Sequence, residues 1–482
     1  MRYLITPAYF IAAVLIPLVF TFMLWGLFRI TGHRDQKIFW GGLIGILGII
    51  PVLSDLTIAR GEFVNGVLRD VWIPPKIIRF LGGWGARGLI YLVLGYGLIL
   101  IVKKLHSKQI EIRAGSGLFF AYLLLIAPSF ISMVAGTRPS FNHFMLYEPL
   151  IFTLVYFARP AEDWSWYVQQ FKRVLLVCIS LSALFGVLAP TWSTGHALTL
   201  IPGFNFRLNG IFSHSNGLGI AALLYLVLDM ADDTRSTLYR KLAWLVSMGV
   251  LIATQSKTAW VSMVLAYGIF CVYKFSILTT ARVRYSAMPI IMGIFILLLG
   301  MGGLIWLIGM GVEKWLSGLD TQTYNSLISL TGRTNIWEIT LRSWQENPIF
   351  GYGPRLWDVE YRLQYAPQFR YIVGMAHNQF LQTLGASGIL GVIGLAIYVF
   401  TLVKLGVQYF STTRGVSLAL VVVFLTRSIS ETPFRNGVLD ITFYAHFILF
   451  VLLMSMVANA NSKKIMNTVV GKSADSREAL SA

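Results

Sequence analysis

Charged residues are scarce in this chain. Asp, Glu, Lys and Arg make up 12% of its 482 residues, whereas 56% are hydrophobic and the mean hydropathy is +0.68. A soluble globular domain carries roughly 25% charged residues, so this composition excludes one. Because a helix bonds its own backbone groups inside a bilayer, we predict an all-α polytopic membrane protein.

Cysteine is nearly absent as well. The two cysteines, Cys178 and Cys271, both lie inside apolar runs, and neither has the spacing to other ligands that is typical of a metal site. A disulfide-rich scaffold is therefore excluded. We predict that both thiols pack in the core.

Acidic residues are few compared with basic ones. Lys and Arg number 39 against 21 Asp and Glu, which gives a net charge of +18. The basic residues are spread through many loops rather than gathered in one arm, which argues against nucleic-acid binding. Anionic lipid head groups and phosphorylated lipids are the partners that this charge favours.

Long apolar runs are abundant. Runs of roughly 17 to 25 residues suffice to cross the hydrocarbon core as helices, and we predict about 13 of them. Their ranges are 8–29, 38–55, 88–103, 117–135, 143–158, 171–190, 216–231, 241–256, 258–274, 286–310, 378–403, 415–430 and 439–458. The first run has no signal-peptide cleavage pattern after it and is interpreted as a spanning helix.

The distribution of basic residues predicts the orientation. Alternate loops are rich in Lys and Arg, as cytoplasmic loops are. The opposite connections are poor in cations, with Arg138, Arg207, Lys257 and Arg435 as the exceptions. This places the long segment 311–376 and the N-terminus outside, and the C-terminal tail in the cytoplasm.

The chain is accordingly divided into five parts. Residues 1–199 form N-terminal membrane helices with an interfacial helix-turn-helix near 60–86, which Pro74 and Pro75 interrupt. Residues 200–310 are membrane helices that carry the first basic motifs. An outer loop at 311–376 contains a helix predicted at 334–346, and Asn347 and Pro348 end it. Membrane helices at 377–458 and a disordered cytoplasmic tail at 459–482 complete the chain.

The candidates for chemistry are polar residues that this topology places at the outer ends of helices. They are Arg207, His214, Asn216, Lys257, Arg333, His377, Asn378, Arg427 and Glu431. Each has an ordinary structural interpretation: Lys257 can extend toward the interface, and Arg427 and Glu431, four residues apart, can form an ion pair on one helical face. A lone histidine is usually a hydrogen-bonded interfacial residue. His377 differs, because it opens a helix directly after the large outer loop.

Four motifs occur in the order and approximate spacing of a known family. They are RLNGIFSHSNGLG from Arg207, TQSKTAW from Thr254, TGRTNIW with NPIFGYG from Thr331, and HNQFLQTLGASGILG from His377. Over roughly residues 200–400 the chain resembles the O-antigen ligase and exopolysaccharide polymerase family. The last motif, with His377-Asn378 and then Gly388 to Gly391, resembles its histidine signature.

The resemblance implies a bundle like the C-type membrane glycosyltransferases, in the bacterial inner membrane with its site facing the periplasm. The donor would be an oligosaccharide on undecaprenyl diphosphate, and no cofactor or metal ion would be needed. Arg207, Lys257 and Arg333 map onto the cations that hold the diphosphate, and His377 maps onto the candidate general base. Fixed cations stabilise the charge that develops on a leaving diphosphate, and histidine is suited to proton transfer near neutral pH.

The acceptor separates two members of this family. A polymerase adds a repeat unit to another lipid-linked glycan, whereas a ligase transfers the glycan to lipid A core or another final acceptor. The motifs around Gly210 to Asn216 and Ser256 to Thr258 resemble the exopolysaccharide polymerase branch more closely, although a lysine is frequent there where this chain has Ser215. We therefore favour a polymerase, with other polysaccharide assembly and export proteins as possible partners.

A transporter for the same lipid-linked sugar is the alternative from another class. Transporters tend to have internal repeats, broken helices in both halves and charges at the midplane. The sequence shows no convincing repeat, and its candidate cations gather at one face. These features favour an enzyme over a transporter.

Overall fold

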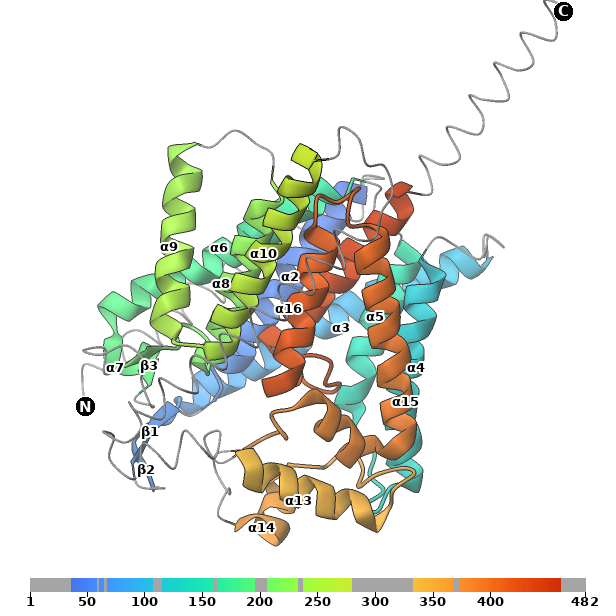
Figure 1. Ribbon diagram of the computed structural model, residues 1–482. Helices are drawn as coiled ribbons and strands as arrows, with labels where there is room; N and C mark the ends of the chain where they lie inside the picture. The colour runs from blue at the N-terminus through green and yellow to red at the C-terminus, as the bar shows by residue number, and fades with distance from the viewer. Residues whose placement is uncertain are drawn as a thin grey trace, which may run out of the picture.

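The computed structural model describes residues 36–58, 60–64, 67–106, 115–158, 163–195, 206–232, 237–279, 333–367 and 373–460. Most of them form helices packed side by side, with a short helical layer across one end (Figure 1). The helices are α2 (Gln36–Asp55), α3 (Lys76–His106), α4 (Ser116–Ala135), η1 (His143–Leu146), α5 (Tyr147–Ala158), α6 (Trp164–Leu188), α7 (Pro190–Ser193), α8 (Ser215–Met230), α9 (Leu238–Thr254), α10 (Lys257–Thr279), α13 (Arg333–Glu346), α14 (Val359–Tyr365), α15 (Gln379–Gln408), α16 (Val416–Ser430) and a last helix, Ile441–Ala460.

The predicted fold class is confirmed. Within the described residues, five helices are long and apolar enough to cross a membrane, and four more are shorter apolar helices. Eleven of the predicted spans coincide with helices of the structure. The runs at 8–29 and 286–310 lie outside the described residues. The chain is therefore a multi-pass membrane protein with an all-α architecture.

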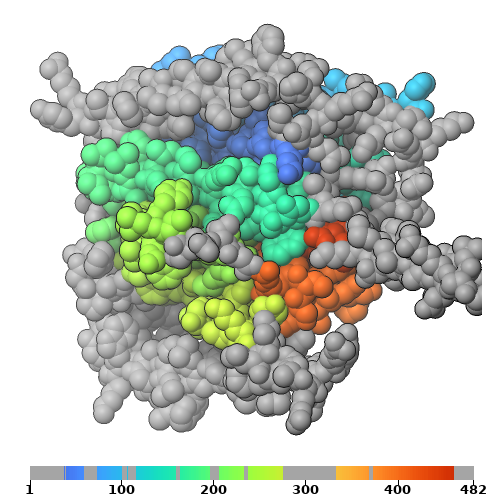
Figure 2. Space-filling view, turned by 90° about the horizontal axis from the view of Figure 1, so that it is seen from above, coloured from blue at the N-terminus to red at the C-terminus, as the bar shows by residue number. Residues whose placement is uncertain are grey.

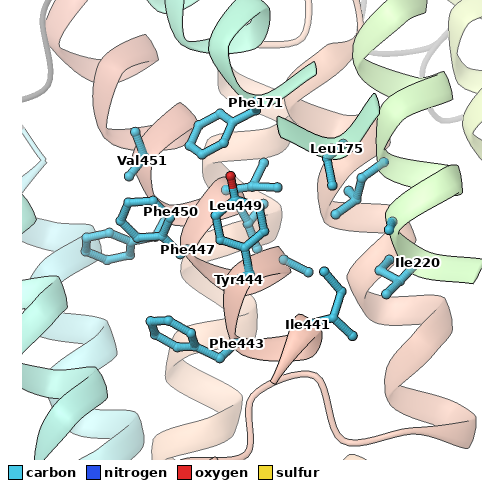
Figure 3. Packing of buried hydrophobic residues seen from close by; sticks show 14 of the residues in the cluster. Phe171, Leu175, Ile220, Ile441, Phe443, Tyr444, Phe447, Leu449, Phe450 and Val451 are labelled. Carbon is cyan, nitrogen blue, oxygen red and sulfur yellow. The ribbon is translucent and has the colours of Figure 1, made fainter. Parts of the chain in front are cut away.

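The last helix forms the centre of the bundle. Its side chains are almost completely buried from Ile441 to Met456. Figure 3 shows Tyr444 and Phe447 of this helix packing near Phe171 of α6. In a membrane an apolar helix can face either lipid or other helices, and here the neighbouring helices cover almost all of it.

The opposite end of the bundle from α13 and α14 carries an ionic network. Lys172 of α6 lies 2.6 Å from both Asp229 and Asp232, and Arg240 of α9 lies 3.0 Å from Asp229. Figure 2 looks onto this end, where the green residues of α6 and α9 lie beside each other. The network ties α6, α8 and α9 together at the side predicted to be cytoplasmic.

The segment predicted as an interfacial helix-turn-helix begins instead with a hairpin. Strand β1 (Arg60–Val64) pairs antiparallel with β2 (Val67–Trp72), and Val64 lies opposite Val67. The prediction of a helix in this part was wrong. Asn65-Gly66 is the dipeptide that most strongly favours a two-residue hairpin turn, and it lies between the two strands in the sequence. The second half is helical as predicted, but it is continuous with the next span in α3.

The prediction for the cysteines holds for one of the two. Cys178 is buried in the core, whereas Cys271 of α10 is exposed on the surface of the described protein. Both are free thiols. An apolar run predicts membrane burial, but it does not show whether a residue faces other helices or lipid.

The segment that precedes α15 is joined to that helix at a break. Gly388 has φ 64° and ψ −160°, a backbone conformation open essentially to glycine alone. The break lets the chain at Pro348 and Ile349 accept hydrogen bonds from Ile389 and Leu390. A Cβ on Gly388 would overlap the Ile349 carbonyl. The helix predicted at 334–346 is confirmed as α13, which ends just before this junction.

Candidate active site

The buried carboxylate of Glu431 is the centre of the candidate site. α16 ends at Ser430, and Glu431 continues in extended backbone, so its side chain leaves the helix surface. One carboxylate oxygen lies 3.6 Å from Arg333 Nη2, and the other lies 3.5 Å from His377 Nδ1. The side-chain amide of Asn216 donates a 2.6 Å hydrogen bond to the first oxygen. One acidic group thus joins three parts of the chain.

These neighbours keep Glu431 ionised. Burial by itself would raise the pKa of its carboxyl, but His377 and the charges of Arg427 and Arg333 outweigh this effect and lower the pKa to about 2. The 3.5 Å separation from His377 suffices for attraction but is too long for a well-formed hydrogen bond. Contacts of this kind shorten when substrate fills an active site.

Arg207 is held by the ends of two helices. Its Nε donates to the Thr254 carbonyl at 3.0 Å, and its Nη2 donates to the Asn216 side-chain oxygen at 3.1 Å. Burial, together with the charge of Arg333, lowers the pKa of Arg207, and Glu431 opposes this shift. The loop between Arg207 and α8 is tied to α2, because Ser213 donates through its backbone and hydroxyl to Asp55, each at 3.0 Å. The guanidinium is therefore fixed before any ligand arrives.

The other residues of this motif support the start of α8. His214 is the N-cap residue, and its Nδ1 accepts a hydrogen bond from the Asn216 backbone at 3.1 Å. That nitrogen is committed to capping the helix. Asn216 links Arg207 to Glu431 through the two ends of its amide. We assign both residues structural support of the site.

Lys257 is the first residue of α10 and is exposed. The preceding turn contains Gln255 in the left-handed conformation, φ 50°, and the Gln255 amide donates to the Phe206 carbonyl at 2.8 Å. The adjacent Thr258 hydroxyl bonds to Ser430 at the end of α16. Lys257 therefore lies beside the end of α16, and burial together with the charges of Arg207 and Arg333 lowers the pKa of its ammonium group.

His377 is fixed by its own backbone neighbours. It has φ 49°, a conformation uncommon for residues other than glycine. The Ala376 carbonyl accepts a hydrogen bond from Trp337, and the Asn378 amide donates to the Ile429 carbonyl, both at 3.0 Å. Asn378 also caps α15 by accepting from the Leu381 backbone. The backbone on both sides of His377 is therefore held between α13, α15 and α16.

Four helices begin at this site. α8, α10, α13 and α15 start at or next to the four residues His214, Lys257, Arg333 and Asn378. A helix start carries partial positive charge and unpaired backbone N–H groups, and such ends bind anions. The sequence placed these residues on one side of the membrane, but it gave no indication that the helix starts converge on one carboxylate.

The predicted ion pair between Arg427 and Glu431 is not formed. Among the described residues, Glu431 makes its ion pairs with Arg333 and His377. The prediction assumed that the helix continues through Glu431, whereas α16 ends one residue earlier. Arg427 is buried, its carbonyl accepts the Glu431 N–H at 2.7 Å, and its Nη1 has no hydrogen-bond partner in the described part of the chain.

A family comparison bears on this arrangement. Residues 241–396 match the O-antigen ligase family model. The match confirms the resemblance suggested by the motifs, and it covers α9, α10, α13 and most of α15, with Lys257, Arg333 and His377. Arg207 and Glu431 lie outside it. None of the curated proteins compared with the chain gives a match. The comparison supports a membrane enzyme of the O-antigen ligase and polymerase type that acts on a lipid-linked glycan.

Proposed function

We propose that the protein polymerises oligosaccharide repeat units carried on undecaprenyl diphosphate into exopolysaccharide or O-antigen. The reaction takes place at the periplasmic face of the bacterial inner membrane, where the end of the bundle that carries α13 and α14 is exposed. The observation that carries the proposal is the meeting of Arg207, Lys257 and Arg333 with the His377–Glu431 pair. Cations for a diphosphate and a candidate base lie in one place.

The three cations hold the donor diphosphate. When the anomeric C–O bond breaks, the electron pair remains on a phosphate oxygen, and nearby positive charges stabilise it. Arginine binds phosphate through paired donors, and lysine adds a compact charge. Before the donor binds, Glu431 offsets part of the positive charge of these three cations. The negative charge of the diphosphate offsets the remainder when it binds.

His377 takes the proton of the acceptor. Its Nδ1 faces Glu431, so a proton on that nitrogen points at a carboxylate, and Nε2 remains as the basic nitrogen. The acceptor hydroxyl oxygen bonds to the anomeric carbon as the bond to the diphosphate breaks, and the hydroxyl proton passes to Nε2. Glu431 stabilises the imidazolium that results. Direct displacement of this kind inverts the anomeric centre.

A ligase reaction is the second candidate, and the description of the matching family favours it. Both reactions use the same donor chemistry and differ only in the acceptor. The similarity of the motifs near Gly210 and Lys257 to exopolysaccharide polymerases supports the polymerase. A transporter is disfavoured because the site holds a histidine–carboxylate pair and its cations gather at one end of the bundle.

Deletion of the gene separates the two candidates. Surface and secreted glycans from the deleted strain are sized on gels, and lipid-linked intermediates are extracted in parallel. For a polymerase we expect single repeat units on the lipid and loss of long polymer. Full-length polymer that accumulates on undecaprenyl diphosphate, and is missing only from its final acceptor, would instead identify a ligase.

A further inference from the structure

A second polar network lies inside the bundle, apart from the candidate site. Glu148 of α5, Tyr398 of α15 and His446 of the last helix are each 2% exposed or less. His446 Nδ1 lies 3.0 Å from the Glu148 carboxylate, and its Nε2 lies 2.7 Å from the Tyr398 hydroxyl. With His446 donating through Nδ1 to the Glu148 carboxylate, its Nε2 accepts a hydrogen bond from the Tyr398 hydroxyl.

Helix packing alone does not account for this network. Moving ionisable groups into an apolar interior costs free energy, and apolar side chains of similar volume often replace buried polar pairs without loss of stability. Ionisable residues inside membrane spans are therefore a sign of function. The role of these three residues is inferred from Phe434, which packs on them.

Phe434 packs directly on the network. Its ring lies edge-on to Tyr398, with centroids 5.5 Å apart, and 5.1 Å from the ring of His446. On a third side it stacks on Phe424 of α16 at 5.8 Å. Phe434 lies three residues after Glu431 in the connection from α16 to the last helix. The network thus fixes one side chain of the segment that carries the central carboxylate.

The same residue is bonded to the segment that carries His377. The backbone N–H of Phe434 donates a 2.9 Å hydrogen bond to the side chain of Gln379, the first residue of α15. On either side of Phe434, Thr432 donates to the Met375 sulfur and Arg435 donates to the Gly374 carbonyl at 2.7 Å. Residues 432–435, which follow Glu431, are therefore bonded to residues on both sides of His377.

We propose that Glu148, His446 and Tyr398 are positioning residues: they fix Phe434 and thereby set the spacing between His377 and Glu431. The inference rests on the proposed glycosyl transfer. None of the three residues touches the reacting atoms, and they act only through Phe434 and its hydrogen bond to Gln379. Loosening Phe434 lets the imidazole and carboxylate drift apart, which slows proton transfer but leaves the cations that bind the diphosphate in place.

Two substitutions test the two links separately. Tyr398→Phe removes one hydroxyl from the network and keeps its ring, and Phe434→Leu removes the ring and keeps the network. The control is Tyr225→Phe, which removes a hydroxyl from a buried tyrosine of α8 beside Lys172, at the other end of the bundle. Each full-length protein is purified, and its thermal unfolding is recorded to show that it is folded.

The measurement is initial-rate kinetics in lipid vesicles with undecaprenyl-diphosphate-linked repeat units extracted from a strain that lacks the chain. We expect Tyr398→Phe and Phe434→Leu each to lower kcat about tenfold or more, which corresponds to about 1.4 kcal/mol in the barrier, with KM for the lipid-linked donor within about twofold of wild type. The control should retain the wild-type kcat. A purely structural role would lower the unfolding temperature and leave kcat unchanged.

Wild-type kcat in either folded variant would overturn the inference, as would an equal loss in the Tyr225→Phe control. If the wild-type protein itself transfers no glycan, the proposed function fails rather than the positioning role. The two failures are therefore distinguishable in one set of assays.

Discussion

Replacing Glu431 with glutamine removes the charge at the centre of the site, and with it the ion pairs to His377 and Arg333. The glutamine keeps an oxygen that accepts the hydrogen bond from Asn216. At 3.5 Å and an effective dielectric constant of about 20, the attraction between a protonated His377 and the carboxylate is about 5 kcal/mol. Desolvation offsets roughly half of such a term, which leaves about 2 to 3 kcal/mol. Since about 1.4 kcal/mol corresponds to a tenfold change, kcat should fall roughly 30- to 150-fold.

The assay is transfer from extracted lipid-linked repeat units by purified protein in vesicles. Glu431→Asp is the matched variant: it keeps the charge on a shorter side chain and should lose less activity than Glu431→Gln. Both proteins must reach the membrane at wild-type levels. A folded Glu431→Gln protein with kcat within threefold of wild type would refute the role of the carboxylate in stabilising the imidazolium.

The same carboxylate makes stability depend on pH. Its pKa is lowered from 4.5 to about 2 in the folded protein, so Glu431 contributes stability that is fully present above about pH 4.5 and is lost as the pH falls toward 2. In thermal unfolding of the purified protein in detergent, wild type should lose stability over this range more steeply than Glu431→Gln. Parallel curves for the two proteins would contradict the lowered pKa.

Four further substitutions test other parts of the account. Arg333→Ala and Lys257→Ala should abolish or greatly reduce glycan transfer at unchanged protein levels, because the diphosphate loses its fixed cations; wild-type chain length on a glycan gel would exclude the diphosphate clamp. His377→Ala should slow the chemical step, and a normal transfer rate would remove His377 as the base. Gly388→Ala should cost about 3 kcal/mol or more of folding stability through strain and overlap with Ile349, so its level in membranes should drop; a wild-type level and unfolding temperature would show that the break in α15 tolerates a side chain.

The helices could be predicted from the sequence because a bilayer imposes a length and a composition on every span. The run at 117–135, for example, corresponds to α4 within one residue at its start. The hairpin at β1 and β2 was missed because a mixed apolar and basic composition suits a strand pair and an interfacial helix equally well. Asn65-Gly66, which favours a two-residue hairpin turn, is the feature of the sequence that distinguishes the two.

The candidate site was predictable as a set of residues but not as an arrangement. Topology alone placed Arg207, Lys257, Arg333 and His377 on one side of the membrane. Arg427 was wrongly predicted as the ion-pair partner of Glu431, because the i, i+4 rule assumes that the helix continues, whereas α16 ends one residue before Glu431.

Contacts between residues far apart in the chain could not be predicted from the sequence. Glu148 and His446 are separated by 298 residues, and each lies within an apolar run where nothing in the local pattern marks a partner. Such contacts depend on which helices become neighbours, and short loops do not fix that order in a bundle of this size.

The most direct test of the central claim is a reaction with purified components. The full-length chain in lipid vesicles is given undecaprenyl-diphosphate-linked repeat units alone, without lipid A core, and the lipid-linked products are sized by mass spectrometry. The account predicts glycans that grow by whole repeat units together with release of undecaprenyl diphosphate, and slower formation of both products with His377→Ala. Donor that stays at a single repeat unit in the presence of folded wild-type protein would contradict it.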